Sequence, residues 1–269
     1  MPDAAVIPPL PRDYHGVNWA GFQTLYLKEV RRFWKVGMQT LFAPVVTALL
    51  YMMVFAVAVR GARPPVEGAP FSAFIAPGLI MMSILNNAFA NSSSSILQSK
   101  MNGLISDFMT PPISPGELLA AFSLGAATRG VVVGLASAAV CIPFAHLGIA
   151  HLWAVLFYGV GASMLLGMLG ILAGLWAEKF DHMAAVTNFI IMPMTFLSGT
   201  FYLVDGLPEP FRSASHYNPF FYLIDGFRYG FIGHAESNLG IGAAMLVGLI
   251  LALGAVCYRI FQTGYKLKT

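Results

Sequence analysis

Long apolar stretches run through this chain of 269 residues and constrain its fold more than any other feature. A helix needs about 20 mainly apolar residues to cross the ~30 Å hydrocarbon core of a bilayer. Hydrophobic residues make up 57% of the sequence and charged residues only 10%, whereas a typical soluble domain has about 25% charged residues. We therefore predict an all-α integral membrane protein with six transmembrane helices, at residues 38–59, 71–93, 118–142, 152–176, 184–204 and 239–258.

These helices and their connections leave no stretch long enough for a soluble catalytic domain. The sequence has no G-x-x-x-x-G-K-[ST] phosphate loop, so it does not bind ATP by that route. No serine or cysteine is placed to form a triad with Asp181 and His182. The six histidines show no metal-ligand spacing. We expect no catalytic residue, no metal and no cofactor in this chain, and the net charge of +3 is too small to predict a nucleic-acid partner.

The lysines and arginines predict the orientation, because cytoplasmic loops carry an excess of them. If the N-terminus is cytoplasmic, four lie outside, at Arg60, Arg63, Arg212 and Arg228, and Arg129 lies within a helix. The ten on the cytoplasmic side are Arg12, Lys28, Arg31, Arg32, Lys35, Lys100, Lys179, Arg259, Lys266 and Lys268. We therefore expect a multi-pass protein with both termini in the cytoplasm, including a Pro-rich tail at 1–17 and a basic tail at 263–269.

Residues 18–36 have the pattern of an amphipathic helix. At 100° per residue, Trp19, Phe22, Tyr26, Val30 and Phe33 fall on one face. The basic residues Lys28, Arg31, Arg32 and Lys35 fall on the opposite face. We expect a helix that lies in the cytoplasmic interface, with its basic face toward lipid phosphates or a partner. A simple anchor helix without a partner fits the same pattern.

A second amphipathic helix is expected at 96–112, in the cytoplasmic loop after the second apolar stretch. Pro111 and Pro112 would end it. Such a helix either docks into a groove on a soluble protein or caps the helix bundle. Its predicted apolar face consists of Leu97, Met101, Leu104, Ile105 and Phe108.

The segment 205–238 is unusually apolar for an external loop, yet it is too interrupted to span the membrane. We predict a re-entrant helical hairpin, which includes Asn218 and Pro219. Asp225 and Arg228 are three residues apart, so they can pair on one helix face and reduce the cost of burying each charge. An ordinary interfacial loop is the alternative.

Polar residues also occur within the predicted transmembrane helices. Asn86, Asn87 and Asn91 make the end of the second helix polar, either to line a substrate path or to form interhelical hydrogen bonds. Arg129 is the basic residue deepest in a helix, where a charge needs a partner or a water-filled cavity. A functional role and snorkelling to the cytoplasmic face are both open for it.

The order of these segments resembles the permeases of the ABC-2 type exporters. Matching features are Phe74-Ile75-Ala76-Pro77-Gly78-Leu79 at the start of the second helix and Ser198-Gly199-Thr200-Phe201-Tyr202 at the end of the fifth. Asn218-Pro219 and Asp225-Gly226-Phe227-Arg228-Tyr229-Gly230 follow in the hairpin. The resemblance covers residues 18–262.

The resemblance implies a bacterial inner-membrane protein that works as a homodimer and binds a separate ABC ATPase, which holds ATP and Mg²⁺. Residues 96–112 would then be the coupling helix, and 18–36 would connect it to the membrane. We expect the chain to be the permease subunit of an ATP-driven exporter rather than an enzyme. An ion-coupled secondary transporter, which would need acidic residues near the middle of the membrane, and a membrane scaffold without transport are the alternatives.

Overall fold

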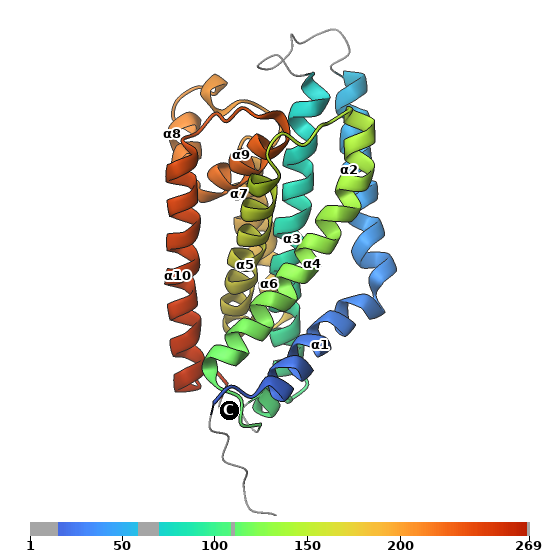
Figure 1. Cartoon of the computed structure of the whole chain (residues 1–269). Coiled ribbons are helices and arrows are strands. Elements are labelled where there is room, and N and C mark those ends of the chain that lie inside the picture. Colours follow the sequence, from blue (N-terminus) through green and yellow to red (C-terminus); the bar gives the residue numbers. More distant parts are fainter. Residues whose placement is uncertain (1–15, 59–69, 109–110, 268–269) are drawn as a thin grey trace, which may run out of the picture.

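The computed structural model describes residues 16–58, 70–108 and 111–267, and this part of the chain is helical without strands (Figure 1). Most of the predicted tail at 1–17 lies outside the described residues, as do Arg12, Arg60, Arg63 and Lys268. The long helices are α1 Trp19–Lys35, α2 Gly37–Ala58, α3 Phe71–Met101, α4 Pro115–Ala145, α5 Leu152–Trp176 and α10 Leu239–Thr263.

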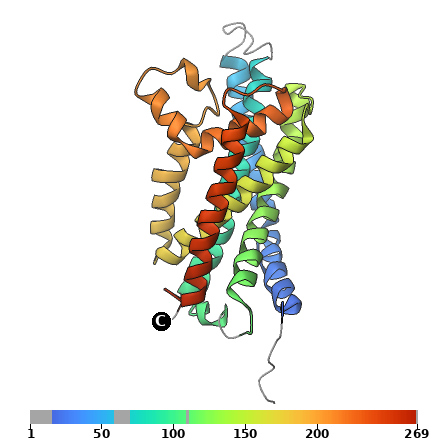
Figure 2. The same cartoon turned by 60° about the vertical axis from the view of Figure 1, so that its left-hand side comes forward.

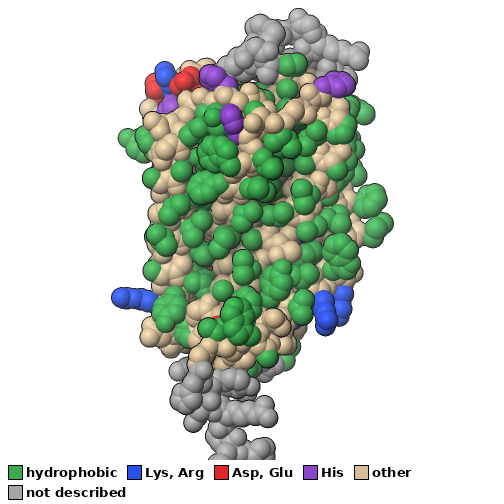
Figure 3. Space-filling view, in the orientation of Figure 1, with side chains coloured by type: hydrophobic (Ala, Val, Ile, Leu, Met, Phe, Trp, Pro, Cys, Tyr) green, Lys and Arg blue, Asp and Glu red, His purple; other side chains and the backbone are tan. Residues whose placement is uncertain are grey.

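Five helices among the described residues are long and apolar enough to cross a membrane. They are α2, α3, α4, α5 and α10, with mean hydropathies from 1.5 to 2.4. Figure 3 shows the resulting belt of apolar side chains, with lysine and arginine near the lower end of this face, and histidine together with acidic and basic side chains near the upper end. This distribution is typical of a multi-pass membrane protein.

The fifth predicted transmembrane stretch, 184–204, does not form one uniform helix. It consists of α6 Phe180–Val186, a π-helical turn η2 Thr187–Ile191 and α7 Met192–Phe196. Pro193 has no backbone N–H to donate within this run, and such a loss favours irregular helical turns. The three segments of 7, 5 and 5 residues extend about 25 Å at 1.5 Å per residue. The count of six transmembrane helices is therefore not confirmed.

Helix α3 is the centre of the bundle. It packs against α4 and α5 along most of its length, and 78% of its most apolar window is buried. Close approach of α5 depends on two glycines: a Cβ on Gly170 would lie 2.5 Å from the carbonyl oxygen of Phe89, and one on Gly174 would lie 2.8 Å from that of Ser93. Small residues at helix contacts are the usual device for tight packing in membranes.

The beginnings of α1 and α4 are joined by one carboxylate. Ser114 caps α4, and the backbone N–H of Ser114 donates to Glu117 Oε2 at 2.8 Å. The backbone N–H of Asn18, which caps α1, donates to Glu117 Oε1 at 2.7 Å. Because Glu117 is buried, these charge-assisted hydrogen bonds fix the two helix ends to each other.

The predicted helix at 96–112 is absent as a single element. Helix α3 continues straight through to Met101, and a short 3₁₀-helix, η1 Ile105–Phe108, follows. Gly103 adopts a positive φ of 70°, which ends the regular helix. Lys100 turns away from this loop and donates to the carbonyl oxygens of Leu175 and Ala177, each at 3.1 Å, at the end of α5.

Three short elements gather at the end of the bundle far from α1 (Figure 1). They are η3 Val204–Gly206, α8 Phe211–Tyr217 and α9 Pro219–Ile232. Helix α9 is largely buried and packs against α5, α3 and α10. The predicted apolar segment thus forms two helices joined at Asn218, and a re-entrant hairpin is not confirmed.

The two ends of the described chain lie at the same end of the bundle (Figures 1 and 2). This arrangement results from the segment α6–η2–α7, which runs from the end of the bundle where α5 ends to the end of the bundle that carries α8 and α9 (Figure 2).

Candidate functional site

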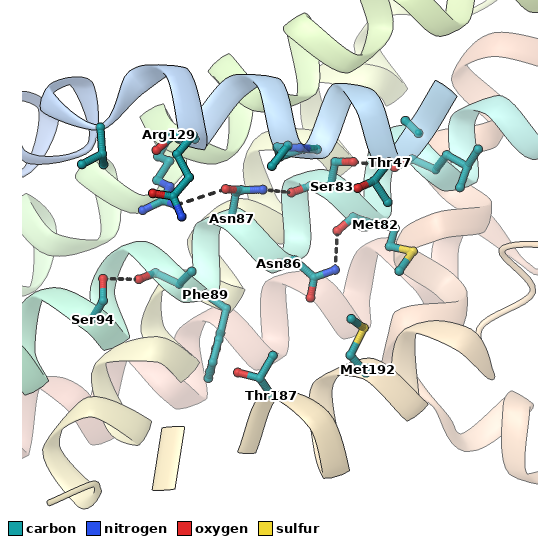
Figure 4. A pocket seen from close by; sticks show the side chains of 18 of the residues that line it. Thr47, Met82, Ser83, Asn86, Asn87, Phe89, Ser94, Arg129, Thr187 and Met192 are labelled. Atoms are coloured by element: carbon teal, nitrogen blue, oxygen red, sulfur yellow. Dashed lines mark hydrogen bonds between the residues drawn. The ribbon is translucent and has the colours of Figure 1, made fainter. Parts of the chain in front are cut away.

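A cavity of about 690 Å³ lies between α2 and α3 on one side and η2 and α7 on the other. Its walls combine polar and apolar side chains, as Figure 4 shows. Asn86 and Phe89 of α3 face Thr187 and Met192 across the space. The polar lining residues are Arg32, Gln39, Thr40, Thr47, Ser83, Asn86, Asn87, Ser94, Arg129 and Thr187.

The asparagines of α3 are held by their own helix. Asn86 Nδ2 donates to the Met82 carbonyl oxygen at 2.9 Å, and Asn87 Nδ2 donates to the Ser83 carbonyl oxygen at 3.1 Å. Each side chain thus uses its amide NH₂ group in this hydrogen bond, and its amide oxygen takes no part in it. Asn86 Oδ1 is buried and has no hydrogen-bond partner among the described residues.

Arg129 of α4 reaches the same cavity. Its Nη2 donates to Asn87 Oδ1 at 3.2 Å, and this is its one side-chain hydrogen bond within the described part of the chain. Its Nε is buried without a partner there. Arg129 is thus half-buried and held beside α3 (Figure 4).

A buried carboxylate, Glu29 of α1, organises a second part of the site. Its side chain is completely inaccessible to solvent. Ser95 Oγ donates to Glu29 Oε1 at 2.6 Å, and Asn91 Nδ2 lies 3.5 Å from Oε2. Lys28 Nζ and Arg32 Nη2 are 3.5 Å and 3.3 Å from its oxygens. Glu29 thus joins α1 to the polar face of α3.

Arg32 continues this network into the cavity. Its Nη2 donates to the Asn91 carbonyl oxygen at 2.5 Å and to Asn91 Oδ1 at 3.1 Å, and its Nη1 donates to Ser94 Oγ at 3.0 Å. The prediction that Arg32 lies on the outward basic face of the helix is therefore wrong. The Arg32 guanidinium points into the bundle because Asn91 and Glu29 supply hydrogen-bond acceptors there, which apolar side chains cannot do.

Glu29 was not predicted from the sequence, although its position in the helix indicates that it is buried. Glu29 is four residues after Leu25 and four before Phe33, and both of these are buried. A carboxylate in line with two buried apolar residues lies on the packed face of a helix. Gly125 of α4 makes room for it: a Cβ there would lie 2.8 Å from Glu29 Cβ.

The other residues predicted for the N-terminal helix are divided between surface and interior. Arg31 and Lys35 are exposed, and so is Lys28. Trp19 is 64% exposed and Phe22 is half-buried. Burial lowers the pKa of Lys28, opposed by the neighbouring Glu29 carboxylate.

The predicted coupling residues are also divided. Leu97 and Ile105 are buried, and Phe108 packs edge-on against Phe122 with 5.4 Å between ring centroids. These side chains belong to the interior of the bundle. Met101 and Leu104 are 52% and 49% exposed at the end of the bundle where α1 begins.

Asp225 and Arg228 lie together in α9, each 1% exposed, with 3.7 Å between Asp225 Oδ1 and Arg228 Nη1. Each also has other partners. The backbone N–H and hydroxyl of Ser237 donate to Asp225 Oδ2, both at 2.7 Å. Arg228 Nη2 donates to the Gly199 carbonyl oxygen at 2.6 Å, and the guanidinium carbon lies 3.9 Å from the centre of the Phe74 ring.

Two features hold this far end in place. Asn218 caps α9, with Pro219 as its first residue, and Asn218 Nδ2 donates to the Met194 carbonyl oxygen of α7 at 2.6 Å. The Asp205 N–H donates to Glu236 Oε1 at 2.8 Å. Burial raises the pKa of Glu236, more than that hydrogen bond lowers it.

A bundle of apolar helices around a partly polar cavity is the arrangement of a membrane transport protein. The sequence matches the ABC-2 type transporter family over residues 20–232, and the chain belongs to that family. It is a membrane-spanning transporter permease.

Individual relatives agree with this family. The chain is 33% identical over 252 residues to the inner membrane transport permease YadH of Escherichia coli K12, which covers 93% of this chain and 98% of YadH. It is 26% identical over 186 residues to nodulation protein J of Rhizobium leguminosarum bv. viciae, covering 67% and 70% of the two chains. Nodulation protein J of Rhizobium meliloti is 21% identical over 248 residues.

Proposed function

We propose that this chain is the permease subunit of an ATP-driven ABC exporter in a bacterial inner membrane. Two copies form the translocation path, and each binds a separate ATPase subunit that holds ATP and Mg²⁺. Family membership and the partly polar cavity beside α2 are the observations that carry the proposal.

Dimerisation is supported by the exposed faces on either side of the cavity. Helices α2 and α10 bury the smallest shares of their most apolar windows, 17% and 11%, and of these two helices α2 is the one that lines the cavity. The run α6–η2–α7 packs chiefly against α5 and α9 and stands at the edge of the bundle (Figure 2). A second copy placed against these faces would enclose the cavity and would support the irregular α6–α7 run as a sixth membrane crossing. Exposed residues on α2 are Met38, Phe42, Val46, Leu50, Met53 and Val54.

Coupling is supported by the loop after α3. Met101 and Leu104 expose apolar side chains on either side of Gly103, at the end of the bundle that carries most of the basic residues. We infer that these two side chains contact the ATPase subunit, because a soluble partner at this end of the bundle would cover them. In this arrangement α1 lies at the cytoplasmic interface, and α8–α9 form the external hairpin.

The test is reconstitution with the ATPase. A cysteine at Leu50 in an otherwise cysteine-free chain should form a disulfide-linked dimer in membranes, whereas one at buried Leu85 should not. The same preparation should retain a co-expressed ABC ATPase subunit and show ATP hydrolysis. A monomeric chain that retains no ATPase would contradict the proposal.

A further inference from the structure

Two arginines from different helices are held against neighbouring turns of α3 at the edge of the cavity. Arg129 of α4 binds Asn87, and Arg32 of α1 binds Asn91, at 3.2 Å and 3.1 Å. Asn87 and Asn91 are four residues apart, so they lie on the same helix face with about 5–6 Å between their Cβ atoms. The geometry therefore places two positive charges close together.

The nearby carboxylate does not balance the charges of these two arginines. Glu29 is the one carboxylate in this network within the described residues, and it is shared by Arg32 and Lys28. The described lining of the cavity contains both arginines and no aspartate or glutamate. Arg129, with its single hydrogen bond to a neutral amide, has no anionic partner there. An ionised side chain within a membrane protein normally has a counter-charge or faces an aqueous space.

Apolar side chains from α2, α3 and α7 also line the cavity. Beyond the arginines its lining includes Leu79, Met82, Phe89 and Met192, together with Tyr51 of α2. These side chains suit a hydrocarbon chain rather than a fully hydrated ion. The cavity of about 690 Å³ can therefore hold the charged end of a ligand beside the arginines and its apolar part beside these side chains.

We propose that this cavity binds an anionic amphiphile, with its phosphate or carboxylate between Arg129 and Arg32 and its hydrocarbon part along α2 and α3. Arg129 supplies the uncompensated charge, and Arg32 supplies the second donor group. This inference rests on the proposed function, in which the cavity is part of the translocation path.

Equilibrium binding of radiolabelled dodecyl phosphate to the purified permease in a neutral maltoside detergent tests the inference. Arg129→Gln is expected to weaken binding at least ten-fold, and Arg129→Lys to restore part of the affinity. Arg259→Gln is the matched control, because Arg259 is exposed on α10 and absent from the cavity lining. Arg32→Gln should weaken binding less than Arg129→Gln, because Arg32 already shares Glu29.

Competition on the wild-type chain separates the head group from the hydrocarbon chain. Unlabelled dodecyl phosphate should displace the probe, whereas dodecyltrimethylammonium and inorganic phosphate at the same concentration should not. Equal binding by Arg129→Gln and Arg259→Gln would overturn the inference. Displacement by inorganic phosphate alone would also overturn it, since the site would then take a free anion. The assay needs no ATPase, so failure to assemble with an ATPase would refute the proposed function without changing this result.

Discussion

Replacing Glu29 by glutamine should destabilise the protein far more than a surface replacement, because Glu29 is the shared partner of two cations and two polar groups. Glutamine keeps the volume and one acceptor oxygen but removes the negative charge. Breaking a buried ion pair by removing one partner costs about 3–5 kcal/mol. Arg32 keeps 23% of its side-chain exposure and Lys28 keeps 44%, so we expect the lower end of that range, about 3 kcal/mol.

The two native cysteines supply the assay. Cys141 and Cys257 are both free and buried, so a thiol-reactive fluorophore reports their exposure during heating in detergent. Glu29→Gln should lower the midpoint of this transition by several degrees. Glu178→Gln, which changes an exposed glutamate, should leave the midpoint unchanged.

A double replacement distinguishes pairing from a simple loss of packing. Arg32→Gln alone should also destabilise, whereas Glu29→Gln with Arg32→Gln should cost less than the sum of the two. Additive losses, or a Glu29→Gln midpoint equal to that of Glu178→Gln, would refute the conclusion that this charge network holds α1 to α3.

Three further predictions concern other parts of the chain. Asp225→Asn and Arg228→Gln should each lower the yield of folded protein, measured as monodisperse protein after gel filtration, and the double variant should recover part of this yield. Strictly additive losses would show that the two residues do not act as a pair. Burial favours protonated Glu236, so the stabilisation by its neutral form is present at low pH and is lost as pH rises through the raised pKa. Glu236→Gln should therefore raise the unfolding midpoint at pH 8 and have less effect near pH 5, and an effect independent of pH would contradict this. Met101→Asp and Leu104→Asp should leave the midpoint unchanged but reduce retention of the ATPase subunit, and normal retention would remove this loop from the proposed contact.

The apolar stretches could be predicted from the sequence because transmembrane helices satisfy their own backbone hydrogen bonds. The stretches at 71–93 and 152–176 both appear as helices, although α3 is longer than predicted because its polar end packs inside the bundle. The stretch 184–204 shows the limit of this approach. Hydropathy does not register that Pro193 lacks a backbone donor or that Gly199 requires a positive φ of 71°.

The site was harder to predict, because its residues are brought together from distant helices. The amides of Asn87 and Asn91 stood out as polar residues in an apolar stretch, and so did Arg129. Their pairing depends on the packing of α1 and α4 on α3, which no local pattern reports. Glu29 was not predicted because the basic residues of α1 were taken to define the polar face of the helix. Its burial also depends on Gly125, which is far away in the sequence.

The joint between α1 and α2 has a mechanical consequence. Helix α1 ends at Lys35 and α2 begins at Gly37, so Val36 alone separates them. The far end of α1 is fastened to the start of α4 through Glu117. A rod of 17 residues is about 25 Å long, so a 5° tilt about one end would displace the other by about 2 Å. Because Arg32 and Val36 line the cavity, a small tilt of α1 together with the parts of α3 and α4 that it binds would move one wall of the cavity.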